Sequence, residues 1–111
     1  MSDESRQYHR TSVDWPARAG RKGLGVAIGR VKNASLGGVY FVTTFDLPIG
    51  DHALIEIQIA PGDKPVLAEG KIARKQPLPV KRSGYGIQFT RIDDMSLMRL
   101  LSVLAKNAET A

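Results

Sequence analysis

The chain contains no cysteine, which excludes disulfide bonds and thiolate metal sites. Histidine is scarce, and neither His9 nor His52 has an acid, a nucleophile or a second metal-ligating residue at a spacing typical of a site. We therefore expect no enzyme activity, no metal and no cofactor. Long apolar runs are absent as well, so the sequence predicts neither a signal peptide nor membrane insertion, and we expect a cytoplasmic protein.

The composition that remains is that of an ordinary globular protein. Its 111 residues are 42% hydrophobic and 24% charged, which is enough for one domain with a single modest core. Sixteen Lys and Arg residues against eleven Asp and Glu residues give a net charge of +5. This charge favours acidic partners such as nucleotides, nucleic acid or anionic membranes, without selecting one of them.

Apolar and polar residues alternate in six short stretches, as expected for strands that are buried on one face. Turns rich in glycine or proline separate these stretches, for example at residues 19–23 and 47–51. Six short strands joined by tight turns predict a mainly β fold, a closed or nearly closed six-stranded antiparallel β-barrel. The predicted strands span residues 11–18, 24–32, 39–44, 52–60, 66–76 and a sixth stretch that includes 85–89.

The period of the pattern changes near the C-terminus, where leucines recur at i, i+3, i+4 and i+7. Asp93 or Asp94 stands directly before this pattern and is a suitable N-cap. We therefore expect an amphipathic helix over residues 94–106 that covers one face or end of the barrel. Its apolar stripe consists of Leu97, Leu100, Leu101 and Leu104.

Two segments carry polar residues suited to a small anionic ligand. Arg6 and Arg10 are four residues apart in an N-terminal segment, 1–10, that has no apolar pattern and that we expect to be flexible. Asn33, Ser35 and Gly38 offer an amide, a hydroxyl and an open backbone between two predicted strands. Taken alone, the first segment is explained better as a solvated basic tail. A capped turn, with Gly37 or Gly38 at positive φ, explains the second.

Taken together, the two segments resemble the signature of the PilZ domain family. The family pattern is Arg-x-x-x-Arg in an N-terminal loop, followed by Asp/Asn-x-Ser-x-x-Gly beside a strand. Arg6, Arg10, Asn33, Ser35 and Gly38 fill its five positions. The resemblance continues through the predicted strands 39–42 and 86–89 and the terminal helix, and so covers nearly the whole chain.

The resemblance implies a split-barrel-type receptor for the bacterial second messenger cyclic di-GMP. Arg6 and Arg10 would contact phosphate and guanine, Asn33 and Ser35 a guanine edge, and Gly38 would keep the surface open. Many relatives have Asp in place of Asn33, so we expect binding to persist with lower affinity. Ser5 replaces a further arginine of some relatives, which favours one ligand molecule over a stacked dimer.

The implied mechanism divides the chain into a ligand-clamping segment, 1–10, and a barrel domain, 11–107. Ligand would order the arginine loop and signal to an unidentified downstream protein, in control of motility, adhesion or exopolysaccharide. Two alternatives remain at this point. One is a ligand-independent PilZ-like adaptor. The other, the runner-up to cyclic di-GMP although nucleic acid is not the expected partner, is a basic barrel. It would bind single-stranded nucleic acid through Arg21, Lys22, Arg30 and Lys32, with Tyr40 or Tyr85 stacking on bases.

Overall fold

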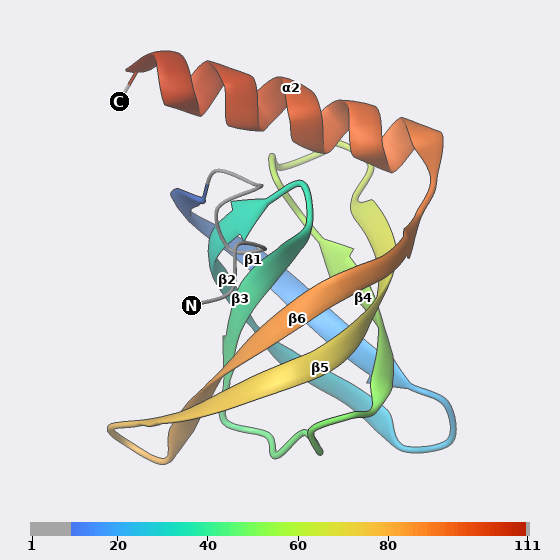
Figure 1. Cartoon of the computed structure of the whole chain (residues 1–111), viewed down its shortest axis with the longest axis vertical. Helices are drawn as coiled ribbons and strands as arrows, with labels where there is room; N and C mark the ends of the chain where they lie inside the picture. Colours follow the sequence, from blue (N-terminus) through green and yellow to red (C-terminus); the bar gives the residue numbers. More distant parts are fainter. Residues whose placement is uncertain (1–9, 111) are drawn as a thin grey trace.

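A computed structural model describes residues 10–110 of the chain, and it shows a β-barrel with one helix across an end (Figure 1). The strands close in the order β1-β2-β3-β6-β5-β4, and every neighbouring pair is antiparallel. The predicted six-stranded antiparallel barrel is therefore confirmed. The elements are β1 (Thr11–Arg21), β2 (Gly25–Ser35), β3 (Gly38–Thr43), β4 (His52–Ile57), β5 (Val66–Leu78), β6 (Arg82–Ile92) and α2 (Asp94–Thr110).

The barrel closes between the first and fourth strands, where Ala17 of β1 lies between Gly29 of β2 and Ile57 of β4. Alternate residues point inward and form the core, as the period-two pattern requires. Ile55 and Ile57 of β4 are fully buried, whereas Leu54, directly before Ile55, is 56% exposed. Other large, fully buried side chains are Val31, Phe41, Val66, Ile72, Tyr85 and Leu100.

Buried Tyr85 ties the β3–β4 loop to the barrel. Its hydroxyl accepts a hydrogen bond from the Leu47 N–H at 2.9 Å and lies 3.3 Å from an Asp46 carboxylate oxygen. Lys75 donates to the same carboxylate at 2.6 Å, and this bond holds the pKa of Asp46 below its usual value. Because Tyr85 is fully buried, it cannot stack on a base, which leaves Tyr40 as the stacking residue of the nucleic-acid alternative.

Strand boundaries differ from the prediction at both ends of β2. The first turn is shorter than residues 19–23, because β1 continues to Arg21 and β2 starts at Gly25. At its other end β2 continues through Ser35, so Asn33 and Ser35 lie in the strand and not in a turn. β4 ends at Ile57, three residues before the predicted end.

Helix α2 crosses the upper end of the barrel in Figure 1 and is fixed there by its first turn. Asp93 is the N-cap, because its carboxylate accepts the Ser96 N–H at 2.7 Å. The Ser96 hydroxyl in turn accepts the Leu67 N–H of β5 at 2.9 Å. Leu100 and Leu104 are buried as predicted, but Leu101 is 44% exposed because the contact with the barrel is narrow. No helix within residues 10–110 is both long and apolar enough to cross a membrane.

Candidate ligand-binding groove

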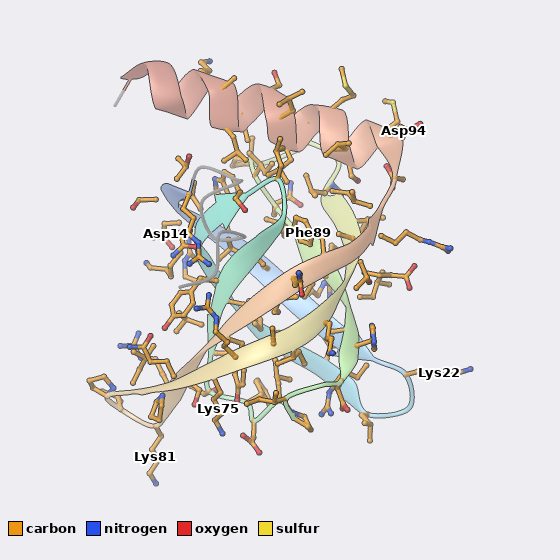
Figure 2. The ribbon with its side chains drawn as sticks, in the orientation of Figure 1. Asp14, Lys22, Lys75, Lys81, Phe89 and Asp94 are labelled. Carbon is orange, nitrogen blue, oxygen red and sulfur yellow. The ribbon has the colours of Figure 1, made fainter. Side chains whose placement is uncertain are left out.

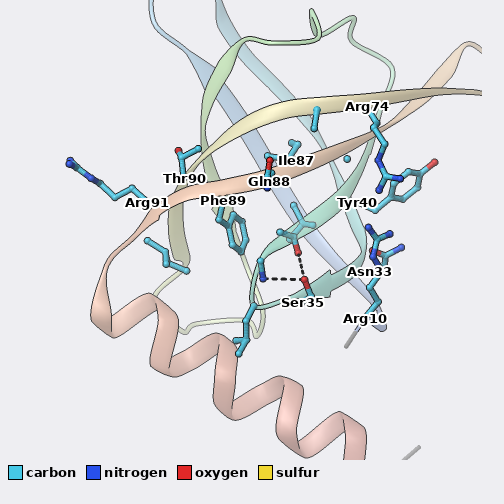
Figure 3. Close-up of a pocket in the computed structure, with 17 residues that line it drawn as sticks. Arg10, Asn33, Ser35, Tyr40, Arg74, Ile87, Gln88, Phe89, Thr90 and Arg91 are labelled. Carbon is cyan, nitrogen blue, oxygen red and sulfur yellow. Dashed lines mark hydrogen bonds between the residues drawn. The ribbon is translucent and has the colours of Figure 1, made fainter. Parts of the chain in front are cut away.

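An open groove of about 730 Å³ runs along the outside of the barrel between β2, β3, β5 and β6 (Figure 3). Arg10, Asn33, Tyr40 and Arg74 gather at one side of it, and Phe89 lies toward the other. Its volume falls within the range of about 300–1,000 Å³ that is common for small-ligand sites. The groove could therefore accept a ligand of nucleotide size.

The groove collects the predicted site residues from separate parts of the chain. Arg10, Asn33, Ser35 and Gly38 all line it. Arg6 lies outside the described residues. Arg10 directly precedes β1, and Ser12 of β1 pairs with Asn33 of β2, which brings the end of the N-terminal segment beside the second motif.

Asn33 owes its position to an irregularity in the sheet. The register between β2 and β3 shifts between Val31 and Asn33, as it does at a β-bulge, and Asn33 then faces Tyr40. Its side chain is half-buried at the groove and makes no hydrogen bond within residues 10–110. Among residues 10–110, the backbone alone therefore orients this amide, and neither its donor nor its acceptor has a partner there.

Ser35 has a different role, because its hydroxyl is already engaged. The Ser35 Oγ accepts the Gly37 N–H at 3.1 Å and lies 3.5 Å from the Gly38 carbonyl oxygen, to which it can donate (Figure 3). The side chain is only 8% exposed. Ser35 therefore holds the turn between β2 and β3, and it can offer a ligand no more than one remaining acceptor site.

Gly38 is a glycine because two strands approach closely there. A Cβ at this position would collide with the Ile87 carbonyl oxygen of β6. The expected positive φ at Gly37 or Gly38 is wrong, since within residues 10–110 the positive-φ glycines are Gly23, Gly25, Gly50 and Gly62. The turn is instead closed without a left-handed residue, and the Ser35 hydroxyl accepts the Gly37 N–H within it.

Arg74 and Tyr40 also line the groove, on the same side as Arg10. The sequence did not point to Arg74, and it named Tyr40 only as a base-stacking residue of the nucleic-acid alternative. The Arg74 side chain lies over Gly86, where an added Cβ would be 3.2 Å from its Nε atom. Tyr40 lies over Gly84 in the same way, and its hydroxyl donates to the Gln76 Oε1 atom at 2.9 Å. The sequence signal that could have indicated these two residues is the pair of glycines at 84 and 86 on the outward face of β6, because glycine leaves space for a large side chain from a neighbouring strand.

The groove is electropositive. Three arginines line it, and within the described residues none of its lining side chains is acidic. Arg10 and Arg74 have no carboxylate within 4.0 Å among residues 10–110, and Arg91 has only Glu69, at 3.9 Å. Guanidinium groups bind phosphate and the O6/N7 edge of guanine with paired donors, so this surface suits an anionic, base-containing ligand.

Solved structures with the same fold include an inhibitor of motility from Bacillus subtilis, MotI/DgrA, with a TM-score of 0.79 and 16% identity. The PilZ domain of YcgR from Escherichia coli with c-di-GMP has a TM-score of 0.72 and 14% identity. The MrkH–c-di-GMP complex from K. pneumonia has a TM-score of 0.71 and 16% identity. The matches cover 95% of this chain in each case, but 51%, 92% and 54% of those chains. The chain thus spans about half the length of MotI and MrkH.

The comparison with curated proteins found no match. The comparison with protein-family models found the PilZ domain over residues 4–106, which includes both arginines of the N-terminal motif and extends into α2. The closed six-stranded barrel with its C-terminal helix agrees with this match. The chain therefore belongs to the PilZ domain family.

Proposed function

We propose that the chain is a receptor that binds cyclic di-GMP in the groove between β2, β3, β5 and β6. The observation that carries this proposal is the convergence of Arg10 with Asn33, Ser35 and Gly38 on one cationic groove. The structures of YcgR and MrkH with c-di-GMP, which share the fold, support the choice of ligand. The ligand is a dianion with two guanines, and it matches both the charge and the size of the groove.

Each residue takes a role that its surroundings allow. Arg10, together with Arg6, contacts phosphate and the guanine O6/N7 edge. Asn33 reads a guanine edge with its free amide, and Ser35 shapes the turn that presents it. Arg74 adds a second guanidinium on the same side of the groove.

Binding orders the arginine segment over the groove. Fixing the backbone of one residue costs about 1–2 kcal/mol, which offsets much of the energy from charge-assisted hydrogen bonds. We therefore expect moderate affinity, near micromolar, or about −8 kcal/mol. The ordered segment creates a surface for a downstream protein, in control of motility, adhesion or exopolysaccharide.

Calorimetric titration of the full chain with cyclic di-GMP tests the proposal. We expect saturable heat at micromolar protein and one ligand molecule per chain. Absence of heat would remove the receptor function and would favour the ligand-independent adaptor. Hydrogen exchange of the segment before β1 provides a second measurement, because ligand should slow exchange there and leave the barrel core unchanged.

Asn33 and Ser35 should differ when each is replaced by alanine. Asn33→Ala should weaken binding about tenfold and change the free energy of unfolding by less than about 0.5 kcal/mol, because the Asn33 side chain bonds no described neighbour. Ser35→Ala should lower the free energy of unfolding by about 1 kcal/mol, because the Gly37 N–H loses its acceptor. Calorimetry and urea denaturation separate the two effects.

Asn33→Asp serves as the matched gain-of-function variant. A carboxylate accepts two guanine protons where the amide accepts one, so the affinity should rise about five- to tenfold. Unchanged affinity in both Asn33 variants would show that the guanine edge is read elsewhere. The stability change in Ser35→Ala would stand regardless of that result.

The nucleic-acid alternative loses two of its supports in the structure. Arg30 and Lys32 both bind the Asp14 carboxylate, at 2.6 and 3.2 Å, and lower its pKa. Arg21 binds Asp51 at 2.9 Å. Three of the four cations assigned to a phosphate track are therefore already paired, and Tyr85 is buried.

A further inference from the structure

Three loops lie at the barrel end opposite α2 (Figure 1). They are the β1–β2 turn, the β3–β4 loop and the β5–β6 hairpin. Each exposes an apolar side chain to solvent: Leu24 is 64% exposed, Phe45 51%, Ile49 60% and Val80 83%. We call these four side chains the loop-end surface.

Ion pairs fix the three loops relative to one another. Arg21 of the first turn binds Asp51 of the β3–β4 loop at 2.9 Å. Asp46 of that loop binds Lys75 of the hairpin at 2.6 Å, and buried Tyr85 supports the same carboxylate. The β1–β2 turn and strand β5, which leads into the β5–β6 hairpin, are therefore both connected to the β3–β4 loop.

The hairpin tip adopts a conformation that its sequence disfavours. Val80 has φ of 63° and Lys81 has φ of 55°, in the left-handed region, which suits glycine or asparagine. A β-branched residue there is unfavourable for folding, and 83% exposure means that Val80 gains little from packing. Backbone strain at an exposed apolar tip is typical of a position with a role other than stability.

Cations surround these tips. Residues 70–92 include no acidic residue, and of their six Lys and Arg residues Lys75, Lys81 and Arg82 belong to the β5–β6 hairpin. Figure 2 shows Lys22, Lys75 and Lys81 at the loop end. The only carboxylates that the described loops contribute there, Asp46 and Asp51, are both paired with cations. The loop end thus has a net positive charge from Arg21, Lys22, Lys75, Lys81 and Arg82.

We propose that the loop-end surface docks on anionic phospholipid bilayers. Single aliphatic and aromatic tips can enter the interfacial region while Lys and Arg side chains reach the phosphate groups. A protein partner would require a contiguous apolar centre, whereas these tips lie on separate loops with charged residues between them. Nucleic acid would require stacking platforms, and three of the four tips are aliphatic.

This attachment needs no spanning segment and leaves the nucleotide groove accessible. Asn33, Ser35 and Gly38 of the groove lie near the opposite end of β2 and β3 from the β1–β2 turn. Docking would place α2 and the N-terminal side of the groove away from the lipid (Figure 1). The inference does not depend on cyclic di-GMP, and its test uses none.

Sedimentation of the full chain with vesicles tests the inference. Vesicles of equal parts phosphatidylcholine and phosphatidylglycerol should retain the protein, and vesicles of phosphatidylcholine alone should not. Raising NaCl from about 0.1 M to about 1 M should release it, because the screening length falls from about 10 to about 3 Å. The double variant Lys81→Ala, Arg82→Ala should weaken vesicle binding about 30-fold, because each cation near an anionic surface contributes roughly fivefold and the two effects multiply.

Val80→Asn separates docking from folding. Asparagine accepts left-handed φ, so the melting temperature should stay the same or rise, while vesicle binding falls about tenfold. Met98→Asn and Lys106→Ala remove an exposed apolar residue and a cation from α2, and both should leave vesicle binding unchanged. No retention by phosphatidylglycerol vesicles would overturn the inference. An equal loss of vesicle binding in the α2 variants would also overturn it. So would binding of single-stranded DNA that the loop-end variants abolish, if the vesicles retain no protein.

Discussion

Replacing Arg10 by alanine should weaken cyclic di-GMP binding by ten- to a hundredfold. Arg10 lines the groove beside Asn33, on the same side as Arg74 (Figure 3). Hydrogen bonds to charged groups contribute about 1.5–3 kcal/mol each when one partner is removed, which corresponds to this loss. Calorimetry of the full chain measures the change. Stability should be unaffected, because Arg10 makes no ion pair among the described residues.

Two further variants show whether charge alone explains the effect. Lys22→Ala removes one positive charge from the β1–β2 turn, outside the groove, and should leave affinity within about twofold, since exposed charges beyond a Debye length are screened. Arg10→Lys keeps the charge but loses the planar donor pair, so it should recover only part of the affinity. Full recovery by lysine would mean that Arg10 acts as a point charge and not as a bidentate ligand.

The barrel could be predicted from the sequence because successive residues of a strand point alternately into the core and toward solvent, so apolar and polar residues alternate along the chain. β4 illustrates this, with Ile55 and Ile57 buried and Leu54 exposed, in the order that the alternation requires. Alternation does not locate bulges, however. The register shift before Asn33 extends β2 through Ser35, and no period-two pattern identifies the inserted residue.

The groove could be predicted only where the motif names its residues. Arg74 and Tyr40 meet because β3, β6 and β5 are neighbours in the barrel, an order that differs from their order in the chain. Their side chains then lie over Gly86 and Gly84, which permit the contact without encoding it. Recognising that pair from sequence would have required the strand order first, and hairpin reasoning supplies only sequential neighbours.

Alanine at Gly38 should act on folding more than on ligand binding. The added Cβ would collide with the Ile87 carbonyl oxygen, and a strand carbonyl in a paired sheet cannot move freely. Forcing a methyl group into a packed region costs about 1–3 kcal/mol, and each kcal/mol lowers the melting temperature of a small domain by about 4–8 °C. Thermal denaturation measures the shift, and calorimetry well below the midpoint measures affinity on folded protein.

Two other glycines provide matched controls. In Gly29→Ala the added Cβ would collide with the Val42 carbonyl oxygen, and Gly29 does not line the groove. This variant should therefore lose a similar amount of folding stability while its affinity for cyclic di-GMP stays unchanged. Gly20→Ala should be nearly neutral, because its nearest contact would be the Val26 Cγ2 atom at 3.7 Å. If Gly38→Ala melts like wild type and fails to bind, its glycine serves ligand approach, as the family resemblance implies. Loss of stability with binding retained would assign Gly38 to the close contact between β3 and β6.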